Sequence, residues 1–482
     1  MADPASDPSR FDIAVLGAGP AGVGAAVTAA WAGARVLVID EAPQTGGQVY
    51  RALPEGITLA PGVRSLEAAE GARQRAELEA SGAQLVTDHR VWMVSEGFRI
   101  EALGPQGPAK WQADRLIAAT GTHERVVPFP GWTLPGVLGL AATTILMKSQ
   151  RMAPGRRVLV AGCGPLLAYV AAGLGKIGAQ VVGVADLAGP ADWARALPRM
   201  LARPDLMARG AGWVAQIAAR RVPYLPRHHV LRAEPGADDA LRVTLARIGR
   251  DGRPGPERLI EADALAVGHG LVPGTELTRL LRAAHDWRPE RGGWIARRDT
   301  EFRTSVPGLY LVGDGGGISG AAAAWHQGRV AGLAAARAAG IGDAQILSDR
   351  ITLERRALRA AEGFGRAMSA IMAPRAPLYA AIPADTPVCR CEDVTRAEIE
   401  AAVAAGATEV NQVKHWTRCG MGPCQGRMCG EAAAEIVAAK QGASRVQAGL
   451  WTGRAPLRPV PLADLAGDFD YADIPIPKPA PL

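Results

Sequence analysis

Residues 11–40 read FDIAVLGAGPAGVGAAVTAAWAGARVLVID, and this stretch decides the fold. The apolar run from Phe11 to Leu16 predicts a buried parallel strand. Glycines in G-x-G-x-x-G spacing follow, small residues predict a helix to about Gly33, and a second apolar strand ends at Asp40. A strand, a glycine turn, a helix and a second strand that ends on an acid are together typical of a dinucleotide site.

Each glycine of this turn has a predicted role. Gly17 allows the tight turn, Gly19 lets the backbone approach a pyrophosphate, and Gly22 lets the helix pack closely on the strand. The N-terminus of the helix points its free N–H groups at the phosphates. Asp40 stands where a carboxylate that binds the ribose belongs.

A second unit of the same kind lies at residues 158–186, VLVAGCGPLLAYVAAGLGKIGAQVVGVAD. Gly162 and Gly164 repeat the first two glycines, but Leu167 replaces the third. Asp186 would suit a ribose diol and repel a 2′-phosphate, so NADP is disfavoured. Three interpretations stay open: a site for a hydride donor such as NADH, a site for another nucleotide such as ATP, and a structural relic.

Two later motifs complete the set. Residues 119–132 read ATGTHERVVPFPGW, and residues 313–321 read GDGGGISGA before a long Ala-rich helix. With the first unit, Thr120-Gly121 and Gly313-Asp314 resemble the flavoproteins of the glutathione reductase and thioredoxin reductase type over about residues 10–345. The resemblance implies an α/β fold with two dinucleotide-binding domains. In that family the first unit holds the ADP half of FAD and the later aspartate holds the ribityl chain, which implies Asp314 here.

The resemblance implies a larger set of FAD-binding residues, spread over four loops: Gly17, Gly19, Pro20, Ala21, Gly22, Asp40, Glu41, Gly46, Gly47, Gln48, Thr120, Gly121, Gly313, Asp314 and Ala321. Disulfide reductases of this type need a cysteine pair beside the flavin. The first cysteine, Cys163, lies inside the second glycine turn, and the next is Cys389. We therefore exclude a disulfide reductase, and no catalytic residue is predicted.

A small module near the C-terminus carries the other five cysteines. Residues 388–430 read VCRCEDVTRAEIEAAVAAGATEVNQVKHWTRCGMGPCQGRMCG, with 32 residues between Cys391 and Cys424. This pattern resembles the bacterioferritin-associated ferredoxin domain, a small [2Fe–2S] domain. The resemblance implies Cys389, Cys391, Cys424 and Cys429 as cluster ligands, with Cys419 as the spare. The closing pair is wider than in the free-standing ferredoxin, so the choice between Cys419 and Cys429 stays open. Thiolates beside a flavin favour [2Fe–2S] over zinc.

Composition excludes other classes of function. The 482 residues carry a net charge of +7 with a sequence pI near 9.3, but no dense basic run, so nucleic-acid binding is not expected. No apolar stretch is long enough for a transmembrane segment, and the polar N-terminus has no secretory signal. We expect a cytoplasmic protein, with or without peripheral membrane association through its electron acceptor.

The combination of a flavin-reductase scaffold with a ferredoxin-like module narrows the choice of protein family. Over nearly its whole length the chain resembles the larger flavoprotein subunit of opine oxidases, hydrogen cyanide synthase and dye-linked proline or hydroxyproline dehydrogenases. The resemblance implies an electron-transfer subunit that works beside a catalytic flavoprotein subunit, with or without a small [2Fe–2S] subunit. The alternatives are a self-sufficient NADH-dependent flavin and iron–sulfur reductase, and a scaffold subunit with structural zinc.

We predict six segments. They are an FAD-binding domain in two parts (10–122 and 271–345), a second nucleotide-binding-like domain (123–270), a helix and Pro-rich linker (346–387), a [2Fe–2S] domain (388–445) and an extended tail (446–482). The tail is too poor in periodicity to form a core of its own and suits docking on a partner. The amine substrate, the terminal acceptor and the stoichiometry are not encoded in any motif.

Overall fold

The computed structural model describes residues 7–53, 56, 66–249 and 254–466. Its first domain is built on a seven-stranded sheet of order β3-β2-β1-β6-β5-β4, with β19 paired to β6. The strands β1, β2, β3, β19 and the end of β6 run parallel, and β4 and β5 form an antiparallel meander with the start of β6. This is the predicted dinucleotide-binding architecture. Its elements up to the first crossing are β1 (Arg10–Leu16), α1 (Pro20–Trp31), β2 (Val36–Ile39), α2 (Leu66–Ala80), β3 (Gln84–Val86), β4 (Arg90–Ser95), β5 (Arg99–Gly104) and β6 (Gly107–Ala118).

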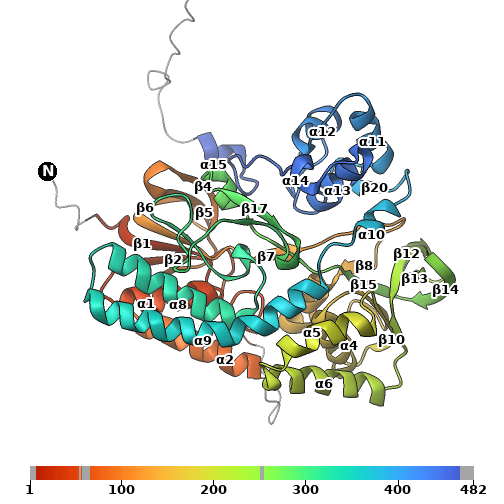
Figure 1. Cartoon of the computed structure of the whole chain (residues 1–482), viewed down its shortest axis with the longest axis horizontal. Coiled ribbons are helices and arrows are strands. Elements are labelled where there is room, and N and C mark those ends of the chain that lie inside the picture. Colours follow the sequence, from red (N-terminus) through yellow and green to blue (C-terminus); the bar gives the residue numbers. More distant parts are fainter. Residues whose placement is uncertain (1–6, 54–55, 57–65, 250–253, 467–482) are drawn as a thin grey trace, which may run out of the picture.

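The chain returns to this domain after residue 273 and covers one face of the sheet with helices. The returning elements are α7 (Glu276–Leu280), β17 (His285–Arg288), β18 (Gly293–Ala296), β19 (Leu309–Leu311), the short turn Gly313–Gly316, α8 (Ala321–Ala338) and α9 (Ala344–Ile371). Figure 1 shows α1, α8 and α9 side by side beneath the sheet. Helices α1 and α8 approach closely because glycines face the neighbouring backbone: a Cβ at Gly328 would lie 1.9 Å from the Ala21 carbonyl oxygen.

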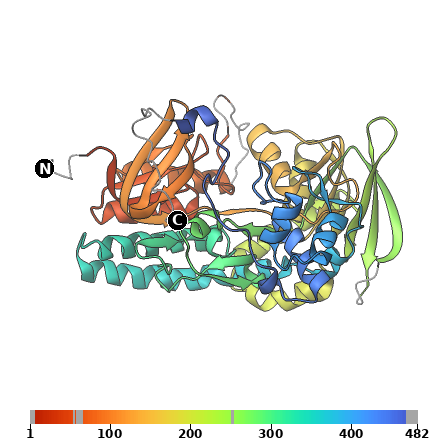
Figure 2. The ribbon, with the colours of Figure 1, turned by 90° about the horizontal axis from the view of Figure 1, so that it is seen from above.

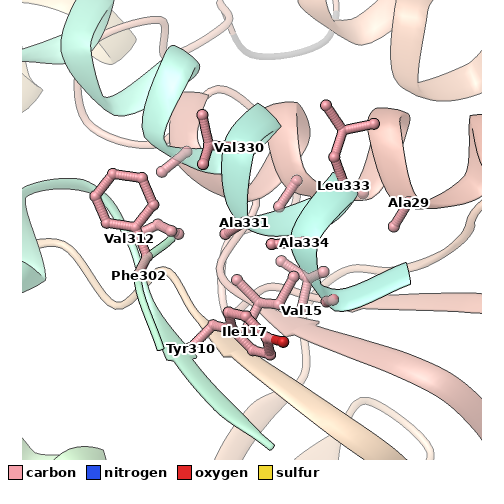
Figure 3. Close-up of a cluster of buried hydrophobic side chains, with 14 of the residues drawn as sticks. Val15, Ala29, Ile117, Phe302, Tyr310, Val312, Val330, Ala331, Leu333 and Ala334 are labelled. Atoms are coloured by element: carbon pink, nitrogen blue, oxygen red, sulfur yellow. The ribbon is translucent and has the colours of Figure 1, made fainter. Parts of the chain in front are cut away.

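The core of the first domain lies between this sheet and these helices. Val15 and Ile117 from the sheet meet Val330 and Leu333 from α8, all of them buried (Figure 3). Alternation is absent in β1 and β2 because both faces of a parallel sheet are covered. The continuous apolar runs in the sequence predicted this burial.

The second domain has a five-stranded sheet of order β11-β10-β9-β15-β8 and a separate three-stranded antiparallel sheet, β12-β13-β14. Figure 2 shows the latter projecting at one end of the molecule. Residues 190–219 form two helices, because Pro204 starts a new one after a break. The elements are β8 (Val137–Gly139), α3 (Leu140–Ile145), a π-turn (Leu146–Gln150), β9 (Arg157–Gly162), α4 (Pro165–Lys176), β10 (Gln180–Asp186), α5 (Pro190–Met200), α6 (Pro204–Ala219), β11 (Tyr224–Pro226), β12 (His228–Pro235), β13 (Leu241–Ile248), β14 (Pro254–Ala262) and β15 (Ala264–Gly268).

Two short antiparallel strands carry the chain between these domains, β7 (Thr122–Glu124) outward and β16 (Leu271–Pro273) on return. The C-terminal domain follows α9 and lies beside this crossing (Figures 1 and 2). Its elements are α10 (Ala376–Ala380), β20 (Pro387–Cys389), β21 (Val394–Thr395), α11 (Arg396–Ala404), α12 (Val410–Thr417), α13 (Gly430–Gln441) and α14 (Arg445–Ala448). Thr395 and Glu398 form the capping box of α11.

The predicted extended tail differs in two respects. It contains the short helices α14 and α15 (Leu462–Ala466), and residues 451–458, here called the strap, lie on the chain's own first domain. The Leu457 backbone N–H donates to the Trp92 carbonyl oxygen at 2.7 Å, and the Leu457 side chain packs against the core of that domain. The strap is thus docked on the first domain of this chain itself. Residues 467–482 of the predicted tail lie outside the described residues.

Candidate cofactor sites

The first glycine turn is held by contacts that tolerate no side chain. Gly17 has a φ of +103°, and a Cβ there would lie 2.5 Å from the Ala119 carbonyl oxygen. A Cβ at Gly22 would lie 1.7 Å from the carbonyl oxygen of Gly17. Gly19 is the N-cap of α1, and Pro20 is its first residue, which needs no N–H donor there. The turn and the helix N-terminus therefore have the geometry that a pyrophosphate site requires.

Asp40 anchors this turn. Its Oδ2 accepts from the backbone N–H of Ala18 at 2.5 Å, and its Oδ1 accepts from that of Ala42 at 2.8 Å. Burial raises the pKa of Asp40. The neighbouring Glu41 is exposed, and its carboxylate lies 3.3 Å from Arg458 of the strap. Both acids of the predicted ribose site stand at the end of β2, and Asp40 fixes the shape of the glycine turn.

The predicted second glycine loop folds back onto the first turn. The Gly46 N–H donates to the Ala18 carbonyl oxygen at 2.8 Å. A Cβ at Gly47 would lie 2.9 Å from the Cα of Gly19, so the two loops pack backbone against backbone. Gln48 follows directly and is partly exposed. The structure therefore brings this loop to the phosphate turn.

The motifs at 120–121 and 313–314 meet at the ends of β6 and β19. A Cβ at Gly315 would lie 3.0 Å from the Thr120 hydroxyl oxygen. Asp314 Oδ1 accepts from the backbone N–H groups of Ser319 (2.8 Å) and Gly320 (3.0 Å), immediately before α8 begins at Ala321. Burial raises the pKa of Asp314. The carboxyl thus stands just before the N-terminus of α8 and orders the turn that leads into this helix.

The second glycine turn is filled by the chain itself. A Cβ at Gly164 would lie 2.6 Å from the Sδ of Met372, the residue that ends α9. The Arg375 guanidinium donates to the Leu187 carbonyl oxygen at 3.0 Å, which ties the following segment to the end of β10. Leu167 is buried in the core of this domain. The space above the turn is therefore taken by the linker to the C-terminal domain.

Asp186 is likewise engaged. Its Oδ1 accepts from the Ala188 N–H at 2.8 Å, and its Oδ2 accepts from the Tyr224 hydroxyl at 2.5 Å and the Trp193 indole N–H at 3.2 Å. The side chain is 1% exposed. Three of the roughly four acceptor positions of this carboxylate are therefore taken by groups of the chain itself.

Arg125 is a buried position between the domains that sequence reasoning missed. It is 2% exposed, and its guanidinium donates to the carbonyl oxygens of Met372 (2.8 Å) and Gly292 (2.7 Å). Its Nε lies 3.9 Å from Glu431 of α13. One side chain thereby joins both nucleotide-binding domains, the linker and the C-terminal domain. The nearest sequence signal was its place three residues after the Thr-Gly-Thr motif.

The five C-terminal cysteines gather as a group of three and a pair. The Sγ atoms of Cys389, Cys419 and Cys429 all lie within 4.8 Å of one another, and all three residues are buried. The thiols of Cys419 and Cys429 hydrogen-bond to Cys389 and lower its pKa to about 2. Cys391 and Cys424 hydrogen-bond to each other and are more exposed. The predicted spare, Cys419, thus lies beside two of the predicted ligands.

This arrangement fits a thiolate metal site. The loop around it is compact, since a Cβ at Gly422 would lie 2.2 Å from the Cβ of Cys391. The backbone N–H groups of Gly420 and Glu392 bond to Cys389 and favour its thiolate. Two soft thiolate pairs suit an iron–sulfur cluster, and four of these thiols would also suit zinc.

Comparison with known proteins defines the class. The family described as pyridine nucleotide-disulphide oxidoreductase matches residues 11–328, and the sarcosine oxidase A3 domain matches residues 386–468. The chain therefore belongs to the pyridine nucleotide-disulphide oxidoreductase family, and this match supports a bound flavin. It is an oxidoreductase. Of the helices in the described ranges, none is apolar over a length that would cross a membrane.

Particular relatives narrow this class. An opine oxidase subunit of Rhizobium meliloti (strain 1021) is 33% identical over 468 residues, which cover 95% of this chain and 99% of that protein. The HcnB subunit of hydrogen cyanide synthase from Pseudomonas protegens is 34% identical, over 93% of this chain and 96% of the relative. The L-proline dehydrogenase of P. horikoshii shares the fold, with a TM-score of 0.68 and 20% identity over 95% of this chain and 80% of that chain. Within its class, the chain is a member of the group that contains this opine oxidase subunit and HcnB, as the sequence predicted.

Proposed function

We propose that this chain is the FAD- and [2Fe–2S]-containing electron-transfer subunit of a hetero-oligomeric oxidoreductase that oxidises the C–N bond of an amino or imino acid. The relatives are named as subunits of opine oxidase and hydrogen cyanide synthase, which supports both the substrate class and the need for partner subunits. The observation that carries the proposal is the docking of the cysteine site against the flavin-type domain. That contact supports a relay between two redox sites of one chain.

FAD would be held by the first domain. The turn at Gly17–Gly22 and the N-terminus of α1 would bind its pyrophosphate, Glu41 and Asp40 would face the ribose end, and Asp314 would face the ribityl chain. When bound, FAD exchanges electrons either singly or in pairs. The N-terminus of α8, which begins at Ala321, would place its positive end near the flavin and favour a negative charge there.

The cysteine site would hold the cluster. We keep Cys389, Cys391, Cys424 and Cys429 as ligands on the spacing of the sequence, because Cys419 lies in the same 4.8 Å group as Cys389 and Cys429 and the geometry does not separate Cys419 from Cys429. Two cysteines on each iron is the arrangement of a [2Fe–2S] site. Cys419 would then be a buried neighbour. Positive charge close by, from Arg418, Arg427 and Lys414, would offset the charge of the cluster.

The filled second glycine turn argues against the self-sufficient NADH reductase. Met372 stands over Gly164, and Asp186 is bound by Tyr224 and Trp193. Electrons would therefore enter from a partner rather than from a nucleotide held by the second domain. A catalytic flavoprotein subunit would carry the substrate pocket, with or without a small [2Fe–2S] subunit beside it.

The test is to isolate this chain alone and together with the proteins that co-purify from its source. Alone, it should show flavin and cluster absorbance but reduce no dye with opines, proline, hydroxyproline or glycine, because no motif of this chain holds a substrate carboxylate. The complex should turn over one of these substrates, and turnover should reduce the flavin of this chain. Turnover by the isolated chain would overturn the proposed division of labour.

A further inference from the structure

A polar cavity lies between the first domain and the C-terminal domain. Strands β7, β16 and β18 and helix α7 line one side, and the cysteine loop, α13 and the start of the strap line the other. About 40 Å³ is open to the centres of water-sized groups. One water needs about 10–15 Å³ by this measure, so the cavity holds roughly three such groups.

The walls of this cavity carry hydrogen-bond donors without acceptors. Among the residues that the structure describes, three lining N–H groups have no hydrogen-bond partner, Arg279 Nε, Trp294 Nε1 and Trp451 Nε1, while Arg445 Nε lies 3.5 Å from Glu435 Oε1 without a hydrogen bond. Arg445 is 8% exposed and Trp451 is 7% exposed. One lining acceptor, Glu431 Oε2, is also without a hydrogen bond. Donors thus outnumber acceptors in a site that water reaches poorly.

The cavity holds one arginine, Arg279, without a direct ion pair among the described residues, although Glu276 attracts it and Arg445 also lies 3.5 Å from Glu435. Arg427 pairs with Glu276 at 2.8 Å, and Arg445 pairs with Glu431 at 3.0 Å. The Arg279 guanidinium donates to the Trp451 carbonyl oxygen at 2.6 Å, and it has no ion pair within 7–53, 66–249 and 254–466. A neutral occupant would leave this guanidinium without a direct ion pair.

We propose that this cavity binds one small monovalent oxyanion, of the carboxylate or bicarbonate class. Indole and guanidinium N–H groups donate and cannot accept, so water, which must also donate, would satisfy them poorly. An oxyanion accepts from several donors at once and matches the charge of Arg279. The volume admits formate, acetate or bicarbonate and excludes a whole amino acid.

The position of the site gives the anion a structural consequence. Trp294 and Arg279 belong to the first domain, whereas Arg445 and Trp451 belong to the C-terminal region. One anion bonded to both sets would join the flavin-type domain to the cysteine domain. Binding should therefore stabilise the docked arrangement, independently of the flavin content and of turnover.

The experiment is a calorimetric titration of the full chain, with its cofactors, by formate and separately by bicarbonate. Ionic strength is held constant with HEPES, whose anion is too large for the cavity. We expect saturable binding of one anion per chain. The anion that binds more tightly, formate or bicarbonate, shows whether the site prefers the carboxylate or the bicarbonate class. The double variant Trp294→Phe with Trp451→Phe keeps both rings and removes two N–H donors, so the affinity should fall at least tenfold.

A matched control and a second variant complete the test. Trp416→Phe changes an exposed tryptophan of α12 outside the cavity and should bind as the original chain does. Arg279→Lys keeps the charge but loses the Nε donor, and Arg279→Gln loses both the charge and the donor. The affinity for the anion should therefore fall in Arg279→Lys and fall further in Arg279→Gln. A titration of the original chain without saturation, or an unchanged affinity in the double tryptophan variant, would overturn the proposal.

Discussion

The sulfur of Met372 occupies the place above Gly164 where the second dinucleotide-type turn would receive a phosphate. A Cβ at Gly164 would lie 2.6 Å from that Sδ and 2.7 Å from the Cγ. The residue belongs to the end of α9, more than 200 positions further along the chain. The linker to the C-terminal domain therefore packs against the turn that, in an NADH reductase, would bind the phosphates of the hydride donor.

The first prediction is that NADH does not rapidly reduce the flavin of this chain. Stopped-flow mixing with NADH should leave the flavin band unbleached on the timescale of substrate turnover by the complex. Dithionite should bleach it, which shows that the flavin is reducible. Bleaching by NADH faster than amine turnover would instead support the reductase interpretation, and Met372 would then have to move on binding.

The second prediction concerns the FAD turn. Gly22→Val adds a side chain whose Cβ would lie 1.7 Å from the Gly17 carbonyl oxygen, so α1 must move away from the turn. The ratio of flavin to protein after purification should fall at least tenfold. Gly212→Val is the matched control, because Gly212 lies in α6 with nothing within 4 Å of its added Cβ. A folded Gly22→Val chain that retains full flavin would refute the site.

Sequence reasoning reached the parts of the site that depend on short spacing. The turn at Gly17–Gly22 is decided by contacts within one βαβ unit, and its glycines were predicted with their reasons. The cysteines were recognised as a site, because their spacing places them on two neighbouring loops. The same reasoning predicted Asp40 at the ribose end, where the structure adds a role in holding the Ala18 N–H.

The remainder depends on contacts between segments far apart in the chain. Asp186 looked free for a ribose, but Tyr224, 38 residues away in the sequence, donates its hydroxyl to it. Arg125 and Met372 bond across 247 positions. No local pattern encodes such pairs. The strap was predicted to seek a partner because its composition lacks periodicity, and the structure shows that the partner of residues 451–458 is the first domain.

The third prediction separates the cysteines. Single Cys→Ser changes at positions 389, 391, 424 and 429 should abolish the cluster, because each removes a thiolate ligand. Cys419→Ser should retain it, although Cys419 lies within 4.8 Å of Cys389 and Cys429. Iron and acid-labile sulfide analysis is the measurement. Loss at Cys419 with retention at Cys429 would exchange their roles, and zinc without sulfide in the original chain would favour the structural scaffold.

The fourth prediction is a pH dependence of stability. Burial raises the pKa of Glu124 from 4.5 to about 7, and both carboxyl oxygens lie near the Ala141 N–H, at 3.1 and 3.2 Å. The folded chain then holds this proton more tightly than the unfolded one. The stabilising contribution of this bound proton on Glu124 is fully present below pH 4.5. It is lost as the pH rises through about 7, and the free energy of unfolding then falls by roughly 3 kcal/mol in total.

Glu124→Gln should remove this part of the pH dependence, because the amide does not ionise. Urea unfolding midpoints measured from about pH 4.5 to about pH 8 should fall less steeply in this variant than in the original chain. Glu79→Gln, an exposed change on α2, serves as the control and should follow the original profile. Parallel profiles for Glu124→Gln and the original chain would contradict the prediction.

The last prediction compares two Arg–Glu pairs of equal length beside the cysteines. Arg427–Glu276 and Arg418–Glu392 both measure 2.8 Å, but the Arg427 side chain is 16% exposed and the Arg418 side chain is 66% exposed. Arg427 also donates to the Leu457 carbonyl oxygen of the strap at 2.7 Å. Its loss therefore leaves a half-buried carboxylate and a strap carbonyl without their donor.

Arg427→Gln should lower the stability of the docked C-terminal domain by about 2–3 kcal/mol, because a partner left unpaired in a poorly hydrated site bears most of its desolvation cost. Arg418→Gln should cost much less than Arg427→Gln, since water screens an exposed pair. Urea unfolding, followed by the cluster absorbance and by tryptophan emission, measures both. Equal losses in the two variants would show that the contact through Arg427 and the strap does not hold the domains together.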